Sequence, residues 1–192
     1  MIGRFCKNGF GAIAFSLCVT SAASAQETQI ATNGEVELSY QIFGEADGQP
    51  LIMIEGLAAA VRPGGDELTD VLVSKGFRVI RFDSRDAGHS TILTEAGPPP
   101  STDAIIGALM AGEEPPVTYT LSDMADDTLA VLDAAGIEQA HVMGASLGGM
   151  IAQTVAIEHP DRTLSLISVS STTGVALPLN PAHGALGSVC CP

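Results

Sequence analysis

Short apolar runs and amphipathic segments alternate through the middle of this chain. Residues 51–54 form a continuous apolar run, which is typical of a strand buried on both faces of a sheet. Residues 66–74 have the spacing of a short helix, and residues 77–82 form the next buried strand. A strand, helix, strand order predicts parallel pairing. The same patterns predict a hairpin with strands at 29–32 and 36–43 around an Asn33-Gly34 turn, helices at 103–110, 121–135 and 147–158, and strands at 140–143 and 164–169.

The element order predicts the α/β class, with a mostly parallel sheet flanked by helices. Residues 84–117 interrupt the pattern with two proline clusters, and a connection of this length is uncommon without a role. Thr120 and Asp123 form a candidate capping box at the start of the next helix. We expect a partial domain at residues 26–179 and an unpatterned tail at residues 180–192.

The first 25 residues have the order of a secretory signal peptide. Arg4 and Lys7 supply positive charge, residues 10–19 are apolar, and residues 23–25 are small. The apolar run is shorter than the roughly 20 residues that a membrane-spanning helix needs. We therefore expect cleavage after Ala25 and an exported protein, either periplasmic or secreted.

Composition and charge narrow the function classes. Apolar residues make up 46% of the 192 residues, which supports a packed core, and 22 acidic against 8 basic residues give a net charge of −14. Such a surface repels phosphate groups, so we expect no nucleic-acid partner. Cys190 and Cys191 are adjacent and the other two cysteines lie in the predicted signal peptide, so neither a disulfide framework nor a metal site is expected. No cofactor and no membrane span are indicated.

Residues 144–148 carry the strongest chemical signal. Gly144, Ser146 and Gly148 match the G-x-S-x-G pattern between a predicted strand and a predicted helix, which is the setting of a nucleophile elbow. A side chain at either glycine would collide where strand and helix come close. We predict that Ser146 is the catalytic nucleophile and that the Leu147 N–H, at the helix N-terminus, is one donor of an oxyanion hole. The alternative is a tight turn with an ordinary capping serine.

A second oxyanion donor is expected in the loop after strand 51–54. Glu55, Gly56 and Leu57 begin this loop, and the Leu57 backbone N–H is the candidate. A backbone donor does not depend on the side chain at position 55. The alternative is a plain glycine turn.

Three stretches around these residues resemble the α/β-hydrolases. Residues 78–90 are similar to a post-strand loop of that family, and residues 119–127 and 141–174 resemble its esterase branch typified by aclacinomycin methylesterase. The resemblance covers roughly residues 27–179. It implies a sheet of eight strands, a helical cap and a Ser–acid–His triad in that chain order. Many members carry histidine before the glycine of the first oxyanion loop, where this chain has Glu55.

The resemblance also implies that parts of the triad come later than the strand at 164–169. We therefore expect a C-terminally truncated and inactive hydrolase, because a serine without a base is a poor nucleophile. We also expect a partner or a second copy to cover the open sheet edge. Four histidines, His89, His141, His159 and His183, could be proposed as a substitute base, but each has a better explanation from its place in the chain. We expect Asp83, Arg85 and Asp86 to brace their loop by ion pairs rather than to serve as the triad acid.

Three function classes remain open. The first is a hydrolase of small-molecule carboxylic esters that forms an acyl-enzyme on Ser146. The second is a non-catalytic exported binding protein that retains the elbow, and the third is a cofactor-free haloperoxidase or lyase on the same fold. The intact elbow favours the first class, whereas the absent histidine favours the second for this chain.

Overall fold

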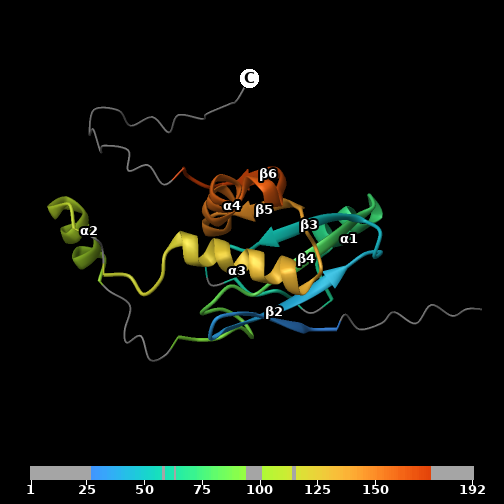
Figure 1. Cartoon of the computed structure of the whole chain (residues 1–192), viewed down its shortest axis with the longest axis horizontal. Coiled ribbons are helices and arrows are strands. Elements are labelled where there is room, and N and C mark those ends of the chain that lie inside the picture. Colours follow the sequence, from blue (N-terminus) through green and yellow to red (C-terminus); the bar gives the residue numbers. More distant parts are fainter. Residues whose placement is uncertain (1–26, 58, 63, 94–100, 114–115, 174–192) are drawn as a thin grey trace, which may run out of the picture.

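Six strands form a single sheet in the part of the chain that the computed structural model describes, residues 27–57, 59–62, 64–93, 101–113 and 116–173 (Figure 1). The strand order is β1-β2-β4-β3-β5-β6. The strands are β1 (Gln29–Asn33), β2 (Val36–Phe43), β3 (Gln49–Ile54), β4 (Phe77–Phe82), β5 (Ala140–Ala145) and β6 (Thr163–Val169), and the helices are α1 (Glu67–Ser74), α2 (Thr102–Ala111), α3 (Leu121–Ala134) and α4 (Leu147–Glu158).

The four strands from β4 to β6 in this order run parallel, whereas β1 and β2 are antiparallel to their neighbours. This arrangement confirms the predicted α/β class with a mostly parallel sheet. Every predicted helix and strand is present, with ends within two residues of those expected. The predicted signal peptide and the predicted tail at residues 180–192 lie outside the described residues.

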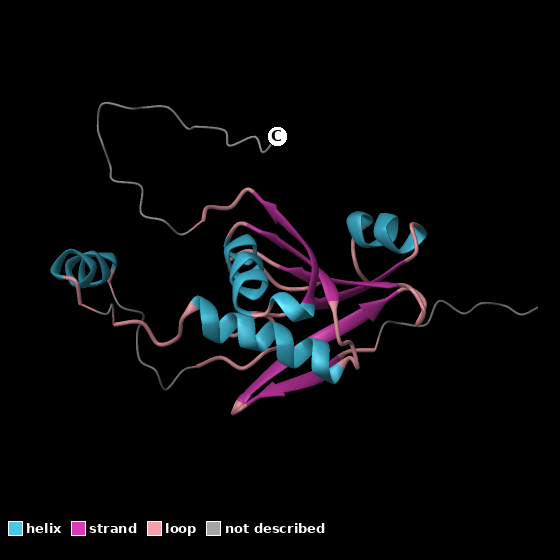
Figure 2. Cartoon of the chain, turned by 45° about the horizontal axis from the view of Figure 1, so that its top comes forward, coloured by secondary structure: helices cyan, strands magenta, loops and turns pink. Residues whose placement is uncertain are grey.

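Helices cover both faces of the sheet (Figure 2). Successive residues of a strand point to opposite faces, and β3 shows this clearly. Ile52 and Ile54 belong to the larger core with α3 and α4, whereas Leu51 and Met53 belong to a smaller core with α1. All four side chains are buried, which explains why residues 51–54 are apolar without alternation. None of the helices in the described ranges is both long and apolar enough to cross a membrane.

The N-terminal hairpin forms as predicted, but its turn lies one residue later than expected. Asn33 pairs with Val36, so Gly34 and Glu35 are the two turn residues. Gly34 has a φ of 61°, which glycine adopts without strain, and glycine at the first central position suits a type II′ turn. The Asn33 side chain instead donates to Asp127 Oδ1 at 2.8 Å.

The predicted capping box opens α3. The Thr120 side chain accepts from the Asp123 N–H, and the Asp123 carboxylate accepts from the Thr120 N–H at 2.7 Å. The Thr120 hydroxyl also donates to this carboxylate at 2.7 Å, and this bond, together with that from the Thr120 N–H, holds the pKa of Asp123 below its ordinary value. The cap therefore fixes where α3 starts and how its buried face meets the sheet.

A buried ion pair attaches the loop after β4 to α3. Arg85 Nε donates to Asp127 Oδ2 at 2.6 Å and Arg85 Nη2 donates to Asp127 Oδ1 at 2.8 Å. Both residues are buried, and the Tyr119 ring lies 5.1 Å from the guanidinium carbon. The hydrogen bonds with Asp127 raise the pKa of Arg85 above its ordinary value. This contact confirms that Arg85 braces its loop by an ion pair.

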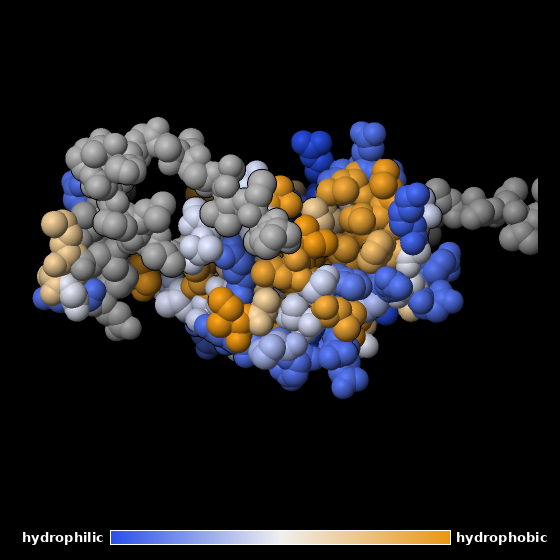
Figure 3. All heavy atoms as spheres, turned by 90° about the horizontal axis from the view of Figure 1, so that it is seen from above, coloured by the Kyte–Doolittle hydropathy of each residue, from blue (hydrophilic) through white to orange (hydrophobic). Residues whose placement is uncertain are grey.

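β6 is an edge strand with exposed apolar side chains. No strand in the described ranges pairs with its outer side. The surface seen from above in Figure 3 shows a broad apolar area. The exposed fractions on β6 are 48% for Leu164, 41% for Leu166, 40% for Ile167 and 41% for Val169.

Breaking the buried ion pair should destabilise the fold strongly. Asp127→Asn leaves the Arg85 charge buried without its anion, and we expect a loss of about 3–5 kcal/mol in the free energy of unfolding. Asp133→Asn is the control, because it breaks the exposed pair with Arg162, for which about 1 kcal/mol or less is expected. Urea unfolding of both variants measures the difference. Equal losses would show that the buried pair has no special weight.

The exposed strand predicts self-association of the 192-residue chain. Burial of a large apolar side chain is worth roughly 1.5–3 kcal/mol, so an uncovered β6 favours any contact that removes it from water. Leu166→Lys should shift the protein toward monomer in size-exclusion chromatography, whereas Leu68→Lys, at a similarly exposed position on α1, should not. A monodisperse wild-type monomer with a sharp, reversible melting transition would contradict this expectation.

Candidate functional site

Ser146 is the single residue between β5 and α4. β5 ends at Ala145 and α4 begins at Leu147, which confirms the predicted strand–turn–helix setting. Ser146 has φ 55° and ψ −121°. A positive φ outside glycine is uncommon and costs of the order of 1–3 kcal/mol, so the surrounding structure must hold this conformation.

Glycines allow the backbones around Ser146 to touch. A Cβ added at Gly144 would overlap the Gly148 carbonyl and lie 2.7 Å from the Gly149 nitrogen. A Cβ added at Gly148 would overlap the Ile54 carbonyl and lie 2.5 Å from the Glu55 oxygen. This confirms the prediction from the motif that a side chain at either glycine would collide with the neighbouring backbone. β5, α4 and the end of β3 therefore pack backbone against backbone.

Backbone hydrogen bonds hold Ser146 from both sides. Its N–H donates to Val169 O at the end of β6, at 2.9 Å, and its carbonyl accepts from the Gly149 and Met150 N–H groups at 3.0 and 3.3 Å. The Ser146 hydroxyl makes no hydrogen bond with any of the described residues. The turn thus fixes the backbone of this serine while leaving its Oγ unengaged in the described part of the chain.

Two stretches of backbone N–H groups lie beside Ser146. Leu147 is the first residue of α4, and the first N–H groups of a helix have no carbonyl partner within it. Gly56 contacts the elbow from the other side, because a Cβ added there would lie 3.5 Å from both Ser146 Cβ and the Ala145 oxygen. Leu57, with a side chain that is 80% exposed, follows directly. The structure therefore places the start of α4 and the start of the loop after β3 beside Ser146. The donor roles of Leu57 and Leu147 stay predictions.

A buried arginine holds the start of the loop after β3, and sequence reasoning did not identify it. Arg81, 3% exposed, donates to the carboxylates of Glu55, at 2.5 Å, and Asp66, at 2.8 Å. Asp66 also caps α1 by accepting from the Thr69 N–H. Burial acts to raise the pKa of Asp66, but the hydrogen bonds from Thr69 and the contact with Arg81 together hold it below its ordinary value. A charged residue inside a predicted buried strand was the available signal.

Asp83, directly after β4, organises the neighbouring loops through backbone hydrogen bonds. Its Oδ1 accepts from the Val61 N–H at 2.6 Å, and its Oδ2 accepts from the His89 N–H at 2.9 Å. Asp86 likewise accepts from the Leu93 N–H at 2.7 Å. These two residues were predicted to brace their loop by ion pairs. The described contacts confirm the bracing but correct its kind, because backbone N–H groups are the main partners of both carboxylates. Asp83 also faces His89 Nδ1 at 3.6 Å, which is an ion pair when that ring is protonated.

The described histidines are engaged away from Ser146. His141 Nδ1 lies 2.7 Å from Ser165 Oγ, His159 Nε2 lies 3.4 Å from an Asp126 oxygen, and His89 Nδ1 lies 3.6 Å from the Asp83 carboxylate. The last of the predicted alternatives, His183, lies outside the described residues. Across the described ranges, no group of three or more His, Cys, Asp or Glu side chains is arranged to hold a metal ion.

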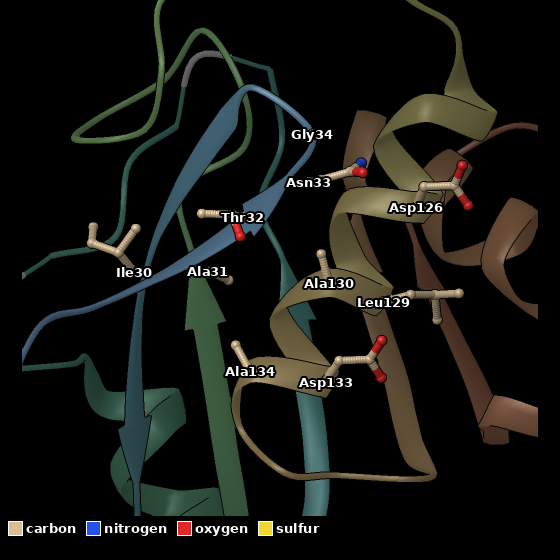
Figure 4. A pocket seen from close by; sticks show the side chains of 10 residues that line it. All are labelled: Ile30, Ala31, Thr32, Asn33, Gly34, Asp126, Leu129, Ala130, Asp133 and Ala134. Atoms are coloured by element: carbon tan, nitrogen blue, oxygen red, sulfur yellow. The ribbon is translucent and has the colours of Figure 1, made fainter.

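A groove between β1 and α3 is the site shown in Figure 4. Its two acidic residues on α3 already have partners, since Asp126 lies near His159 and Asp133 pairs with Arg162. Backbone and small or apolar side chains form much of the remaining wall. The groove therefore gathers no catalytic constellation. Its lining residues are Ile30, Ala31, Thr32, Asn33, Gly34, Asp126, Leu129, Ala130, Asp133 and Ala134.

Comparison with known proteins places these features in a family. The sequence profile of the alpha/beta hydrolase fold matches residues 49–186. A rhodomycin D methylesterase of Streptomyces peucetius is 34% identical over 139 residues, which are 72% of this chain and 40% of that protein. A Caulobacter segnis protein provisionally named a carbamate hydrolase is 43% identical over 145 residues, which are 72% of this chain and 45% of that protein.

A solved structure shares the fold. The crystal structure of a hydrolase from Pseudomonas aeruginosa superposes with a TM-score of 0.56 at 25% identity, over 79% of this chain and 48% of that one. The chain thus spans less than half the length of the relatives it matches. The family match covers more than half of the chain and agrees with the sheet order and the elbow, so this protein belongs to the alpha/beta hydrolase fold family.

Proposed function

We propose that this chain carries the nucleophile and the oxyanion hole of an esterase-like hydrolase, with Ser146 as the nucleophile. The observation that carries the proposal is the backbone of Ser146. It has a positive φ between β5 and α4, beside the start of the loop after β3, and its Oγ is unengaged among the described residues. Strained serines of this kind present their hydroxyl to a substrate.

The chemistry follows from the groups around Ser146. Its Oγ forms a bond to the carbonyl carbon of an ester while the carbonyl π electrons move to oxygen. The Leu147 N–H and the Leu57 N–H would donate hydrogen bonds to that oxyanion, and the α4 dipole adds partial positive charge. The base that takes the proton from Ser146 Oγ returns it to the alkoxide, which leaves as an alcohol when the C–O bond of the ester breaks. The acyl-enzyme that remains is hydrolysed by water, which gives one proton through the base to Ser146 Oγ and so yields the acid and the free serine.

The proton on Ser146 Oγ requires a base. One ring nitrogen of each described histidine, His89, His141 and His159, faces another side chain, and none of the three has a contact with Ser146 within the described residues. A serine hydroxyl without a base is a weak nucleophile at neutral pH. We therefore propose that the 192-residue chain by itself hydrolyses esters only slowly, and that its elbow becomes competent when a base is supplied.

The substrate class is a small-molecule carboxylic ester. One relative is named a methylesterase and shares 34% of its residues with this chain over the matched region. The elbow geometry serves any acyl group, because the reacting atoms are common to all esters. The methylesterase relative and the elbow together favour an esterase over a binding protein or a haloperoxidase.

We also propose that the protein is exported, on the basis of the charged, apolar and small-residue order of its first 25 residues. Expression of the full chain in a bacterial host should give mature protein in the periplasm or medium that starts at Gln26, as measured by intact-mass and N-terminal peptide analysis. Changing Ala23 and Ala25 to bulky residues should block processing. Cytoplasmic protein that still begins at Met1 would contradict export.

Supplying a base from solution tests the nucleophile. Incubation with a fluorophosphonate should label Ser146 slowly, and added imidazole should raise the rate by about tenfold, since a positioned general base contributes about 10²–10⁴-fold and a free one recovers only part. Peptide mass spectrometry locates the label. Ser146→Ala should abolish it, whereas Ser170→Ala, which alters a second serine of positive φ, should not.

Two results would contradict this proposal. Absence of label on Ser146 at any imidazole concentration would show that the hydroxyl is not a nucleophile in this turn. Rapid ester turnover without imidazole, lost in Ser146→Ala and in one histidine variant, would identify a base in the chain and overturn the proposed slow hydrolysis.

A further inference from the structure

We propose that β4 positions the oxyanion loop through two anchors, with Arg81 and Asp83 as positioning residues. The oxyanion loop is defined here as the described residues 55–57 and 59–61, which follow β3 and include Leu57. Arg81 holds its first residue, Glu55, and Asp83 holds its last, Val61. This inference rests on the proposed function, because it concerns how the Leu57 N–H is placed beside Ser146.

The first anchor is an ion pair with a buried cation. Arg81 lies on β4 in register with Met53 of the parallel strand β3, and its guanidinium is shared between Glu55 and Asp66. Thr69 Oγ1 accepts a third hydrogen bond at 3.1 Å. Because Arg81 is 3% exposed and held from several sides, it has little freedom to follow Glu55. The ion pair with Arg81 therefore fixes the position of Glu55, the first residue of the oxyanion loop.

The second anchor is a carboxylate two residues further along. Asp83 is 1% exposed, and its Oδ1 accepts from the Val61 N–H at 2.6 Å. Its other oxygen accepts from the His89 N–H, and a Cβ added at Gly88 would overlap the carboxylate. The backbone of Gly88 therefore packs directly against the Asp83 carboxylate. Both ends of the oxyanion loop are thus attached to β4 or to the residues directly after it.

Leu57 adds little packing to the part of the loop that carries the proposed donor. The Leu57 side chain is 80% exposed, so it does not hold the backbone against the core. A misplacement of about 1 Å in a group that positions a reaction can cost about 10²-fold in rate. The elbow contacts of Glu55 and Gly56 place the start of this loop, and we infer that the two anchors hold the Leu57 N–H at its distance from Ser146. Loss of the Glu55 carboxylate should lower oxyanion stabilisation more than it lowers stability.

The test compares two carboxylates that share one guanidinium. Glu55→Ala removes the anchor in the oxyanion loop, whereas Asp66→Ala removes the N-cap of α1 and leaves the loop contact in place. The readout is the rate of imidazole-dependent fluorophosphonate labelling of Ser146, measured well below the melting temperature. We expect Glu55→Ala to lower that rate by about 10–100-fold, with a smaller loss of Tm than in Asp66→Ala, because Asp66 still pairs with Arg81 and still caps α1.

Asp66→Ala should do the reverse. It should lower Tm by a few degrees through the lost cap, with labelling within about twofold of wild type. Glu55→Gln, which keeps an oxygen acceptor for Arg81, should recover part of the labelling rate. A role in stability alone would make labelling follow Tm in all three variants, which would overturn the inference.

The outcome for wild type separates the two proposals. If wild type is not labelled at Ser146, the proposed function fails. If wild type is labelled and Glu55→Ala is labelled at the same rate, the nucleophile stands and the anchoring of the oxyanion loop by Arg81 is wrong. Labelling that falls equally in Glu55→Ala and Asp66→Ala would likewise show that the pair has no specific effect on the loop.

Discussion

The contact of bare backbone at the elbow is the constraint on which the rest of this structure depends. β5, α4 and the end of β3 meet at Gly144 and Gly148, and no side chain fits at either position. This close approach forces the chain to turn within one residue, so Ser146 takes a positive φ. The strain persists because the hydrogen bond to Val169 and those from the first turn of α4 leave its backbone no other arrangement. An exposed hydroxyl at the end of a parallel strand is the consequence.

The C-terminal end of β4 connects this elbow to the rest of the domain. Three charged residues lie at alternate positions at this end of β4 and directly after it, and each makes a different kind of buried contact. Arg81 binds the carboxylates of Glu55 and Asp66, Asp83 accepts from backbone N–H groups of two loops, and Arg85 pairs with Asp127 on α3. Buried charges persist only when they are paired or well hydrogen-bonded. These three positions therefore resist substitution for structural reasons, and two of them also shape the loop beside Ser146.

The site has one well-built part and one that depends on a further group. Ser146, the proposed nucleophile, and the start of the loop after β3 lie together, whereas the described histidines serve other contacts. Membership of the family therefore rests on the fold and the elbow, whereas catalysis also needs a base beside Ser146. The elbow depends on close backbone packing, and many residues away from Ser146 contribute to that packing. A base requires only one side chain at the right distance, and that side chain is supplied by a separate part of the polypeptide in the triad that the resemblance implies.

Local pattern was enough to predict most elements and the place of Ser146, because both depend on neighbours in sequence. The apolar run of β3, the capping box of α3 and the glycines of the elbow each act within a few residues. Local patterns could not predict strand register or contacts between residues distant in sequence. The Gly34-Glu35 turn follows from the register of β1 against β2, and the partners of Arg81 and Asp83 come from loops and a helix distant in sequence. Sequence by itself therefore determined the order of elements and the position of Ser146 in a strand–turn–helix. The partners of Arg81 and Asp83 were decided only by the tertiary structure, since a buried charge finds its partner through the fold.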